Sequence, residues 1–245
     1  MTGRFACLTY HRVGKTDDQY TVSEAQFCAQ MSFLQTEGYT VEGFKELHHR
    51  LQSKQEFPDR YVVLTLDDGH SSAMIAANCI AGYGFRATFF VTRDYCLEKL
   101  GFIRQRDLCE LHQWGFSLGT HGATHRKLTK LPAEQCHYEL AASRAWLEDL
   151  IGEFVYFTAV PGGFVNALVM RLALEEGYAL VGTCNEWMNA PARQLGSAVK
   201  INRVNIRRHF SIDAFRKIIE GNPSFYLRRQ LRSASLWLPK QLIPS

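Results

Sequence analysis

Two short segments of the sequence carry carboxylate and imidazole side chains at spacings that suit metal-assisted hydrolysis. Asp67 and Asp68 are adjacent and follow an apolar run. Burying two carboxylates there costs free energy unless a cation pairs with them. His121 and His125 are four residues apart, so one helical turn or a tight loop can direct both at one ion. Zinc accepts two His and one carboxylate and leaves a position for water. The combination predicts a metal site, against the alternative of an Asp that caps the next helix and two structural His.

An adjacent pair of carboxylates can divide the work of such a site. A bound metal lowers the pKa of its water and polarises a carbonyl, while a carboxylate that stays off the metal accepts the water's proton. The leaving group then needs an acid. His11 is a candidate, because imidazole can be protonated near neutral pH. The alternative is a structural His that is hydrogen-bonded to a neighbour.

Apolar runs that alternate with helical patterns would position these residues. The predicted strands are 5–10, 61–66, 87–91, 116–120, 155–159, 178–183 and 198–206, and the predicted helices are 23–37, 72–83, 104–114, 133–150, 167–176 and 211–220. Short apolar strands that each precede a helix indicate a parallel sheet buried on both faces. We expect a single α/β domain, a closed or nearly closed β/α barrel, whose catalytic groups follow the strands at one rim.

Composition and charge favour an ordinary globular chain. It has 245 residues, of which 46% are hydrophobic and 21% charged. Seven cysteines without CxxC pairs do not resemble a disulfide framework and favour a reducing compartment. There is no secretory pattern near Met1, and no uncharged apolar run approaches the ~20 residues of a membrane span. We therefore expect a cytoplasmic protein.

The C-terminal segment is basic. Residues 216–245 contain six Lys or Arg against one acid, Glu220, together with several Leu and Trp237. We predict a barrel over residues 1–222 and a basic amphipathic tail over 223–245. The pattern favours a solvated final helix packed by its Leu face; the alternative is a tail that contacts anionic lipid at the inner membrane face or binds a partner. The rest of the chain has no basic stripe or aromatic platform, which argues against nucleic acid as a partner.

The motifs together resemble those of the polysaccharide deacetylases, the carbohydrate esterases of family four. Thr65-Leu66-Asp67-Asp68-Gly69 is similar to the family's TFDDG, His121-Gly122-Ala123-Thr124-His125 to its H-(S/T)-x-x-H, and Pro161-Gly162-Gly163 to its substrate-groove motif. The resemblance spans most of residues 5–206. It implies a distorted (β/α)₇ barrel with a divalent metal, usually zinc. Position by position, it implies Asp68, His121 and His125 as ligands and Asp67 as the base.

The acid distinguishes branches of this family. Most members carry a Leu-x-His motif late in the chain, whereas His209 here lies in a charged segment. The poly-N-acetylglucosamine deacetylase branch has this His near the N-terminus, and Leu8-Thr9-Tyr10-His11 resembles that arrangement. The resemblance therefore implies His11 as the acid, in preference to His209.

Two positions depart from the family pattern. Ala159 stands where an Arg usually orients the catalytic Asp, and Arg203 could replace it from the last strand or form a salt bridge at the barrel end. Gly162 stands where a Tyr is common, and its backbone N–H could serve an oxyanion hole. Trp187 could wall the acetyl pocket or lie in a surface loop. The predicted substrate-binding residues are therefore Pro161, Gly162, Gly163, Trp187 and Arg203.

Three hypotheses for the function follow. The first is a metal-dependent hydrolase that removes N-acetyl groups from N-acetylhexosamine units, with water activated by Asp67 and the amine protonated by His11. A cytoplasmic enzyme would meet a glycolipid or nucleotide-linked precursor rather than a wall polymer. The second is a glycan-binding or scaffold protein that keeps the barrel without the activity, supported by Ala159. The third is an amidase that acts on a non-sugar amide.

Overall fold

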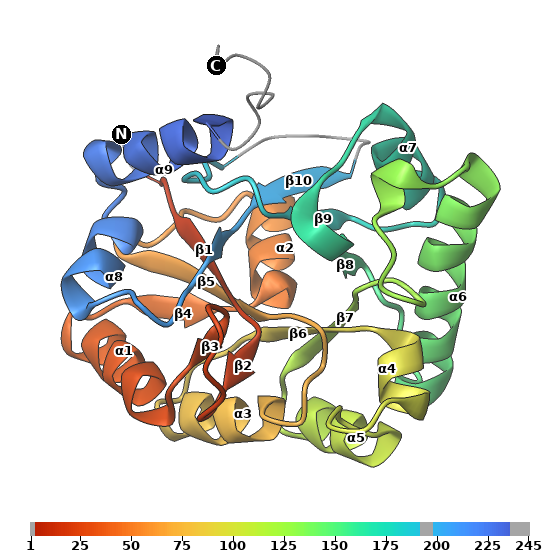
Figure 1. The fold of residues 1–245 in the computed structure, drawn as a ribbon, viewed down its shortest axis with the longest axis horizontal. Coiled ribbons are helices and arrows are strands. Elements are labelled where there is room, and N and C mark those ends of the chain that lie inside the picture. The colour runs from red at the N-terminus through yellow and green to blue at the C-terminus, as the bar shows by residue number, and fades with distance from the viewer. Residues whose placement is uncertain (1–2, 192–197, 236–245) are drawn as a thin grey trace, which may run out of the picture.

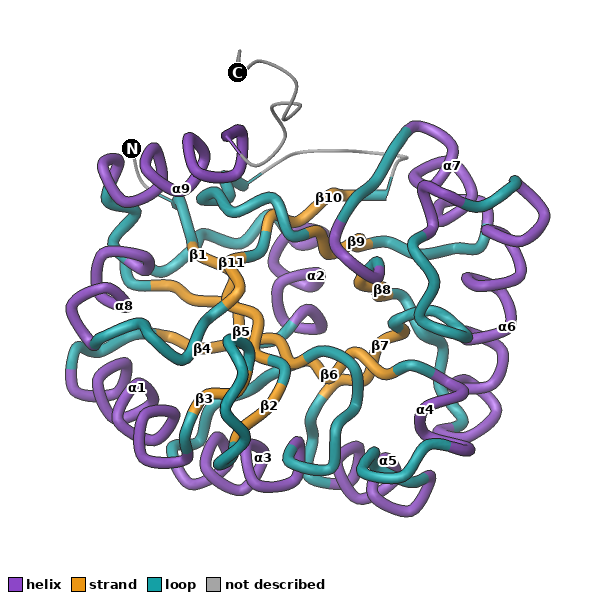
Figure 2. The backbone as a smooth tube through the Cα atoms, in the orientation of Figure 1, coloured by secondary structure: helices purple, strands orange, loops and turns teal. Residues whose placement is uncertain are grey.

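A ring of parallel strands forms the centre of the protein (Figures 1 and 2). The computed structural model describes residues 3–191 and 198–235. Neighbouring strands follow the order β10-β9-β8-β7-β6-β5-β1-β11, with β4 paired to β5, and these pairings are parallel. The strands are β1 (Ala6–Tyr10), β4 (Thr40–Glu42), β5 (Tyr61–Leu66), β6 (Thr88–Val91), β7 (Ser117–Thr120), β8 (Phe157–Ala159), β9 (Leu180–Thr183), β10 (Val199–Asn202) and β11 (Val204–Asn205).

Most of the helices cover the outside of this ring (Figure 1). The helices are α1 (Glu24–Thr36), α2 (Phe44–Ser53), α3 (Ala73–Gly82), α4 (Arg93–Glu98), α5 (Gln105–Gln113), α6 (Ala133–Ile151), α7 (Ala167–Glu175), α8 (Ile212–Ile219) and α9 (Pro223–Ser235). A small parallel pair, β2 (Arg12–Val13) with β3 (Thr21–Val22), and two 3₁₀ turns, η1 (Leu128–Lys130) and η2 (Pro161–Gly163), complete the elements.

Alternation along the strands divides the core into two parts. In β5 all six residues are buried, and Val62, Leu64 and Leu66 pack outward against the helices. Tyr61 and Val63 point the other way, into the barrel. Because successive side chains of a strand point to opposite faces, every second residue of a strand faces the barrel interior.

Helix α2 is the exception to the outer layer. Its residues Phe44 and Leu47 belong to the interior cluster, where Phe44 packs edge-on against Phe90 and Phe157. An added Cβ on Gly43, which precedes the helix, would lie 2.8 Å from the Thr88 hydroxyl at the start of β6. The helix therefore closes the end of the barrel where the strands begin. The opposite end of the barrel, where the strands end, carries the polar residues of the candidate site.

The barrel closes where the last strand changes partner. β10 pairs with β9 and β11 pairs with β1, and Arg203 is the single residue between them. With β10 and β11 taken as one position, the ring passes through β1, β5, β6, β7, β8, β9 and this split strand. The prediction of a single-domain, distorted (β/α)₇ barrel is confirmed.

Several element predictions need correction. The range 198–206 was predicted as one strand, but it is divided at Arg203 because its two halves pair with different neighbours. The sequence pattern did not predict α2, α4, β4 or the short pair β2 and β3. These elements are short, and their apolar residues do not form a long periodic pattern.

The final helix packs against the barrel through aromatic residues. Tyr226 of α9 is 1% exposed and its hydroxyl donates to the Ile218 carbonyl, whereas Leu227 is exposed. The prediction that the final helix packs by its Leu residues is therefore wrong for Leu227. The side chains of 231–235, and residues 236–245 with Trp237, lie outside the described residues. Within the described part of the chain, none of the helices is both long and apolar enough to cross a bilayer.

Candidate active site

The turn after β5 points the side chains of Asp67 and Asp68 in different directions, so the two carboxylates have different partners. Asp67 continues the inward alternation of β5, and its backbone N–H donates to the Tyr10 carbonyl at 2.8 Å. Asp68 has a φ of 72° and Gly69 one of 76°, so the chain turns sharply after Asp67. Left-handed backbone is unfavourable for a residue with a Cβ, and such strain is found at functional sites where the surrounding structure holds it.

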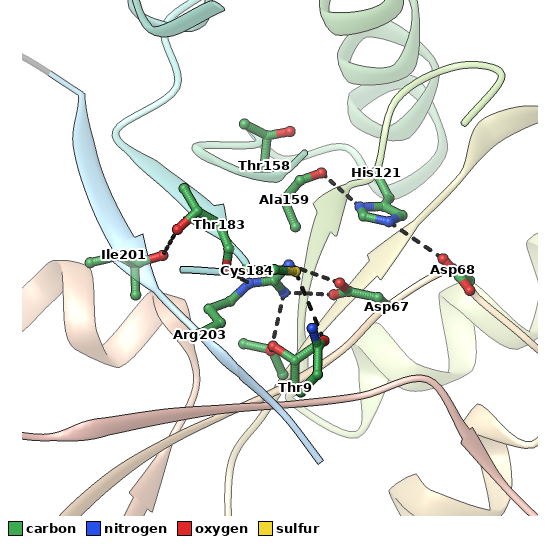
Figure 3. Close-up of polar contacts among 12 residues, drawn as sticks. Thr9, Asp67, Asp68, His121, Thr158, Ala159, Thr183, Cys184, Ile201 and Arg203 are labelled. Carbon is green, nitrogen blue, oxygen red and sulfur yellow. Dashed lines mark hydrogen bonds and ion pairs between the residues drawn. The ribbon is translucent and has the colours of Figure 1, made fainter. Parts of the chain in front are cut away.

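Asp68 meets two imidazoles that follow β7. Its Oδ1 lies 3.1 Å from His125 Nε2 and 3.4 Å from His121 Nε2. One potential ligand atom from each of the three residues lies within 4.8 Å of the others. The structure therefore brings together the three residues that the sequence predicted as metal ligands. Figure 3 shows Asp68 and His121, which follow β5 and β7, facing each other.

The hydrogen bond behind His121 sets which nitrogen faces the cluster. Its Nδ1 lies 2.7 Å from the Ala159 carbonyl, which only accepts, so Nδ1 carries a proton and donates it (Figure 3). The lone pair of the neutral ring is then at Nε2, beside Asp68. A ligand His that donates its other N–H to a carbonyl is the arrangement common at metal sites. The donor set fits a divalent cation such as zinc.

A buried carboxylate that the sequence analysis missed holds the loop between the two His. Glu139 of α6 is 2% exposed and accepts from both the backbone N–H of Thr124, at 2.9 Å, and its hydroxyl. His125, the next residue, has a φ of 65°. Glu139 is an acid between the buried apolar residues Cys136 and Leu140, and that interruption was the available signal. We infer that Glu139 fixes the loop conformation.

Asp67 lies outside the ligand set and pairs with Arg203. The guanidinium donates to its two carboxylate oxygens at 2.7 and 2.8 Å, and the two side chains are 0% and 1% exposed (Figure 3). Arg203 also donates to the Thr183 carbonyl and lies over the Phe90 ring. Gly182 gives it room, since an added Cβ there would lie 2.7 Å from Arg203 Nε.

The sequence predicts that Arg203 either orients the catalytic Asp from the last strand or forms a salt bridge at the barrel end. It is also one of the predicted substrate-binding residues, but it is completely buried, and its side chain forms an ion pair with Asp67 of the candidate site. This contact is the one expected of a residue that orients Asp67. Arg203, which lies between β10 and β11, gives Asp67 the positively charged partner that Ala159 cannot provide.

The charges of the site hold both carboxylates ionised. Burial acts to raise the pKa of Asp67, but the Arg203 guanidinium, with His121, outweighs it and holds that pKa below its usual range. Burial opposes ionisation of Asp68 as well, and its hydrogen bonds with His121 and His125 hold its pKa well below the usual range. Burial acts to lower the pKa of His121, but the two carboxylates raise it overall. A proton therefore competes with a cation for His121.

His11 follows β1 at the same rim. Its Nδ1 atom is buried without a hydrogen-bond partner among the described residues, and its ring lies 5.1 Å from that of Tyr20. Burial lowers the pKa of His11, and the carboxylates of Asp67 and Asp68 offset part of this effect. An unpaired buried nitrogen is rare and available to a ligand. His209, the alternative, is exposed and packs against Phe210.

The substrate-groove motif forms η2. Gly162 is exposed with a φ of 72°, and Pro161 and Gly163 are buried. An added Cβ on Gly163 would lie 2.3 Å from the backbone nitrogen of Cys184, so this position requires glycine. The motif therefore joins η2 closely to the end of β9 and leaves Gly162 at the surface.

Trp187 lies on the side of the C-terminal helix. Its ring packs edge-on against Tyr226 of α9, with 5.4 Å between centroids. This contact gives Trp187 a structural role. Its predicted role as a wall of an acetyl pocket gains no support from that contact.

Comparison with known proteins assigns the family. Residues 54–181 match the family model of the polysaccharide deacetylases, and the chain belongs to that family. It is 25% identical over 215 residues to YxkH of Bacillus subtilis (strain 168), a protein assigned to the polysaccharide deacetylases; the match covers 87% of this chain and 75% of YxkH.

Solved structures share the fold. The deacetylase PplD of Streptococcus pyogenes, in complex with acetate, matches with a TM-score of 0.81 and 20% identity over 89% of this chain and 99% of PplD. IcaB of Ammonifex degensii matches with a TM-score of 0.74 and 22% identity over 89% of this chain and 96% of IcaB. At these identities the likeness is one of fold.

Proposed function

We propose that this chain is a metal-dependent hydrolase that removes N-acetyl groups from N-acetylhexosamine units of a glycan or glycolipid. Asp68, His121 and His125 would hold the divalent ion, for which zinc fits the donor set. When bound, such an ion supplies a Lewis acid that acidifies water and polarises a carbonyl. The family assignment supports deacetylation as the reaction.

Asp67 is the proposed base. It is ionised, is excluded from the ligand cluster and is held in one orientation by two hydrogen bonds from Arg203. A carboxylate held in this way can accept the proton of the attacking water without first rearranging. Its partner Arg203 keeps the charge in place and takes no part in the bond changes.

His11 is the proposed acid, and the rim supplies the remaining contacts. Protonated His11 would donate to the departing amine nitrogen, which must gain a proton as the C–N bond breaks. The backbone N–H of Gly162 is the proposed donor to the developing oxyanion, and Pro161 and Gly163 fix the turn that carries it.

One observation carries this proposal: three ligand atoms converge beside a carboxylate that is kept off them by its own ion pair. Acetate release from N-acetylglucosamine oligomers, measured with bound metal in the same samples, tests it. Asp67→Asn should keep the metal and lose acetate release, whereas His121→Ala should lose both. Full acetate release by Asp67→Asn would contradict the assignment of the base.

The non-catalytic alternative rested on Ala159. Arg203 provides Asp67 with the charged partner that Ala159 lacks, so this departure no longer favours a scaffold protein. The same acetate assay separates the two, since a scaffold would bind the oligomers without releasing acetate. An amidase would release the acid from a non-sugar amide instead, which a comparison of substrates detects.

Contact of residues 223–245 with anionic lipid at the cytoplasmic face remains part of the proposal. Truncation after residue 222 would remove the buried Tyr226, so a change in sedimentation could come from lost stability instead of lost lipid contact. Truncation after residue 235 leaves α9 in place. Equal sedimentation of the full chain and the 1–235 chain with anionic vesicles would show that residues 236–245 make no contribution.

A further inference from the structure

Two cysteines outside the active site lie next to each other on neighbouring helices. Cys28 is on α1 and Cys79 on α3, and their Sγ atoms are 3.0 Å apart. The two helices pack side by side on the outside of the barrel (Figure 1). All seven cysteines of the chain are free thiols.

The separation of these two sulfurs is close to that of a disulfide. A covalent S–S bond is ~2.05 Å long, so the Sγ atoms are about 1 Å from bonding distance. The two sulfur atoms therefore need to approach each other by only about 1 Å for the bond to form.

A surface pocket gives small molecules access to the pair. Its volume is about 430 Å³, and Cys28 and Cys79 both belong to its lining, with Glu24, Ile75 and Asn78. Both thiols are partly exposed, whereas Cys7, Cys96 and Cys136 are buried. Burial and the neighbouring Cys28 raise the pKa of Cys79 to about 12, so its thiolate is scarce at neutral pH. Oxidation should therefore be faster at alkaline pH.

We infer that Cys28 and Cys79 form a reversible redox site that a low-molecular-weight disulfide oxidises. One cysteine thiolate attacks the small disulfide and releases one small thiolate, which leaves a mixed disulfide on the protein. The second cysteine thiolate then attacks the protein sulfur and releases the other small thiolate. In total two cysteine thiols and one small disulfide give the Cys28–Cys79 disulfide and two small thiols.

The bond would join two segments that support the active site. α3 begins just after the turn of Asp67 and Asp68, and α1 follows the small β2–β3 pair that comes after His11. The cross-link spans 51 positions of the chain and restricts the unfolded state. It should raise the melting temperature by about 5–15 °C without changing the metal ligands.

Peptide mapping tests the inference on the full chain. The reduced protein is incubated with oxidised glutathione at pH 8.5, alkylated and digested with trypsin without reduction. Tryptic peptides 16–45 and 61–86 each contain one cysteine, Cys28 and Cys79 respectively. We expect them as one cross-linked species, about 2 Da lighter than their sum, with the rise in melting temperature.

Matched variants separate this pair from general thiol oxidation. Cys28→Ser and Cys79→Ser should lose both the cross-linked species and the temperature shift, whereas Cys109→Ser, a partly exposed cysteine of α5, should behave as the wild type. Separate peptides, each alkylated or carrying glutathione, would overturn the inference. This outcome is independent of acetate release, so it leaves the proposed function standing.

Discussion

Replacement of Arg203 by Met removes the positive partner of Asp67 and leaves a buried carboxylate unpaired. Both side chains are shielded from water and share two hydrogen bonds of 2.7 and 2.8 Å. Loss of one partner from such a buried pair costs about 3–5 kcal/mol. We therefore expect Arg203→Met to lower the free energy of unfolding by that amount.

The same change should move the acid limb of the activity profile. A depressed pKa in the folded state stabilises the protein above the unfolded-state pKa of Asp, ~3.9, and that contribution is lost as the pH falls. Without Arg203, burial acts unopposed by the guanidinium and the pKa of Asp67 rises. The proposed base must be ionised to act, so kcat/KM of Arg203→Met should begin to fall at a pH about 1–3 units higher.

Urea denaturation of the metal-free protein and the pH dependence of kcat/KM measure these two effects. Arg171→Met is the matched control, because Arg171 and Glu175 form an exposed pair at 3.9 Å whose loss should cost under about 1 kcal/mol. The double variant with Asp67→Asn should be less destabilised than the sum of the single variants. A cost for Arg203→Met no larger than the control's, with an unchanged acid limb, would refute the reasoning.

Three further predictions concern the rim. Glu139→Gln replaces an acceptor of two Thr124 donors by one that accepts less well, so the metal dissociation constant from a zinc titration should rise about 10-fold or more; an unchanged constant would exclude the positioning role. Gly163→Ala should destabilise the fold by about 3 kcal/mol or more in urea, because its Cβ would overlap Cys184, and a stable variant would contradict the packing. His11→Gln should keep the metal and lower kcat by about 10²–10⁴. The wild-type activity should fall as the pH rises through the pKa of His11, which burial lowers, and a variant that kept this limb would show another acid.

The convergence of the three proposed ligand residues was predictable because each motif is local. Asp68 lies directly after a strand whose six residues were identified without error, and His121 and His125 follow another. The common edge of parallel strands then brings the two motifs together. Their convergence follows from the strand pattern and the barrel, and no detail of side-chain packing was needed.

Residues whose roles depend on distant partners were harder to predict. Arg203 was a candidate, but its bond to Asp67 depends on the chain leaving β10 for β11 at that residue. Glu139 lies within a helix that was predicted correctly, yet its partner Thr124 is 15 positions away. The predicted role of Trp187 came from the resemblance to the family, and its contact with Tyr226 depends on how α9 packs.

The central claim is that Asp68, His121 and His125 together bind one divalent cation. Equilibrium titration with zinc against a competing chelator measures this directly. We expect about one site per chain, weakened at least 100-fold in Asp68→Ala, His121→Ala and His125→Ala and within a few-fold of wild type in Asp67→Asn. A wild-type chain that binds no zinc, or three ligand variants that bind it as well as the wild type, would contradict the claim.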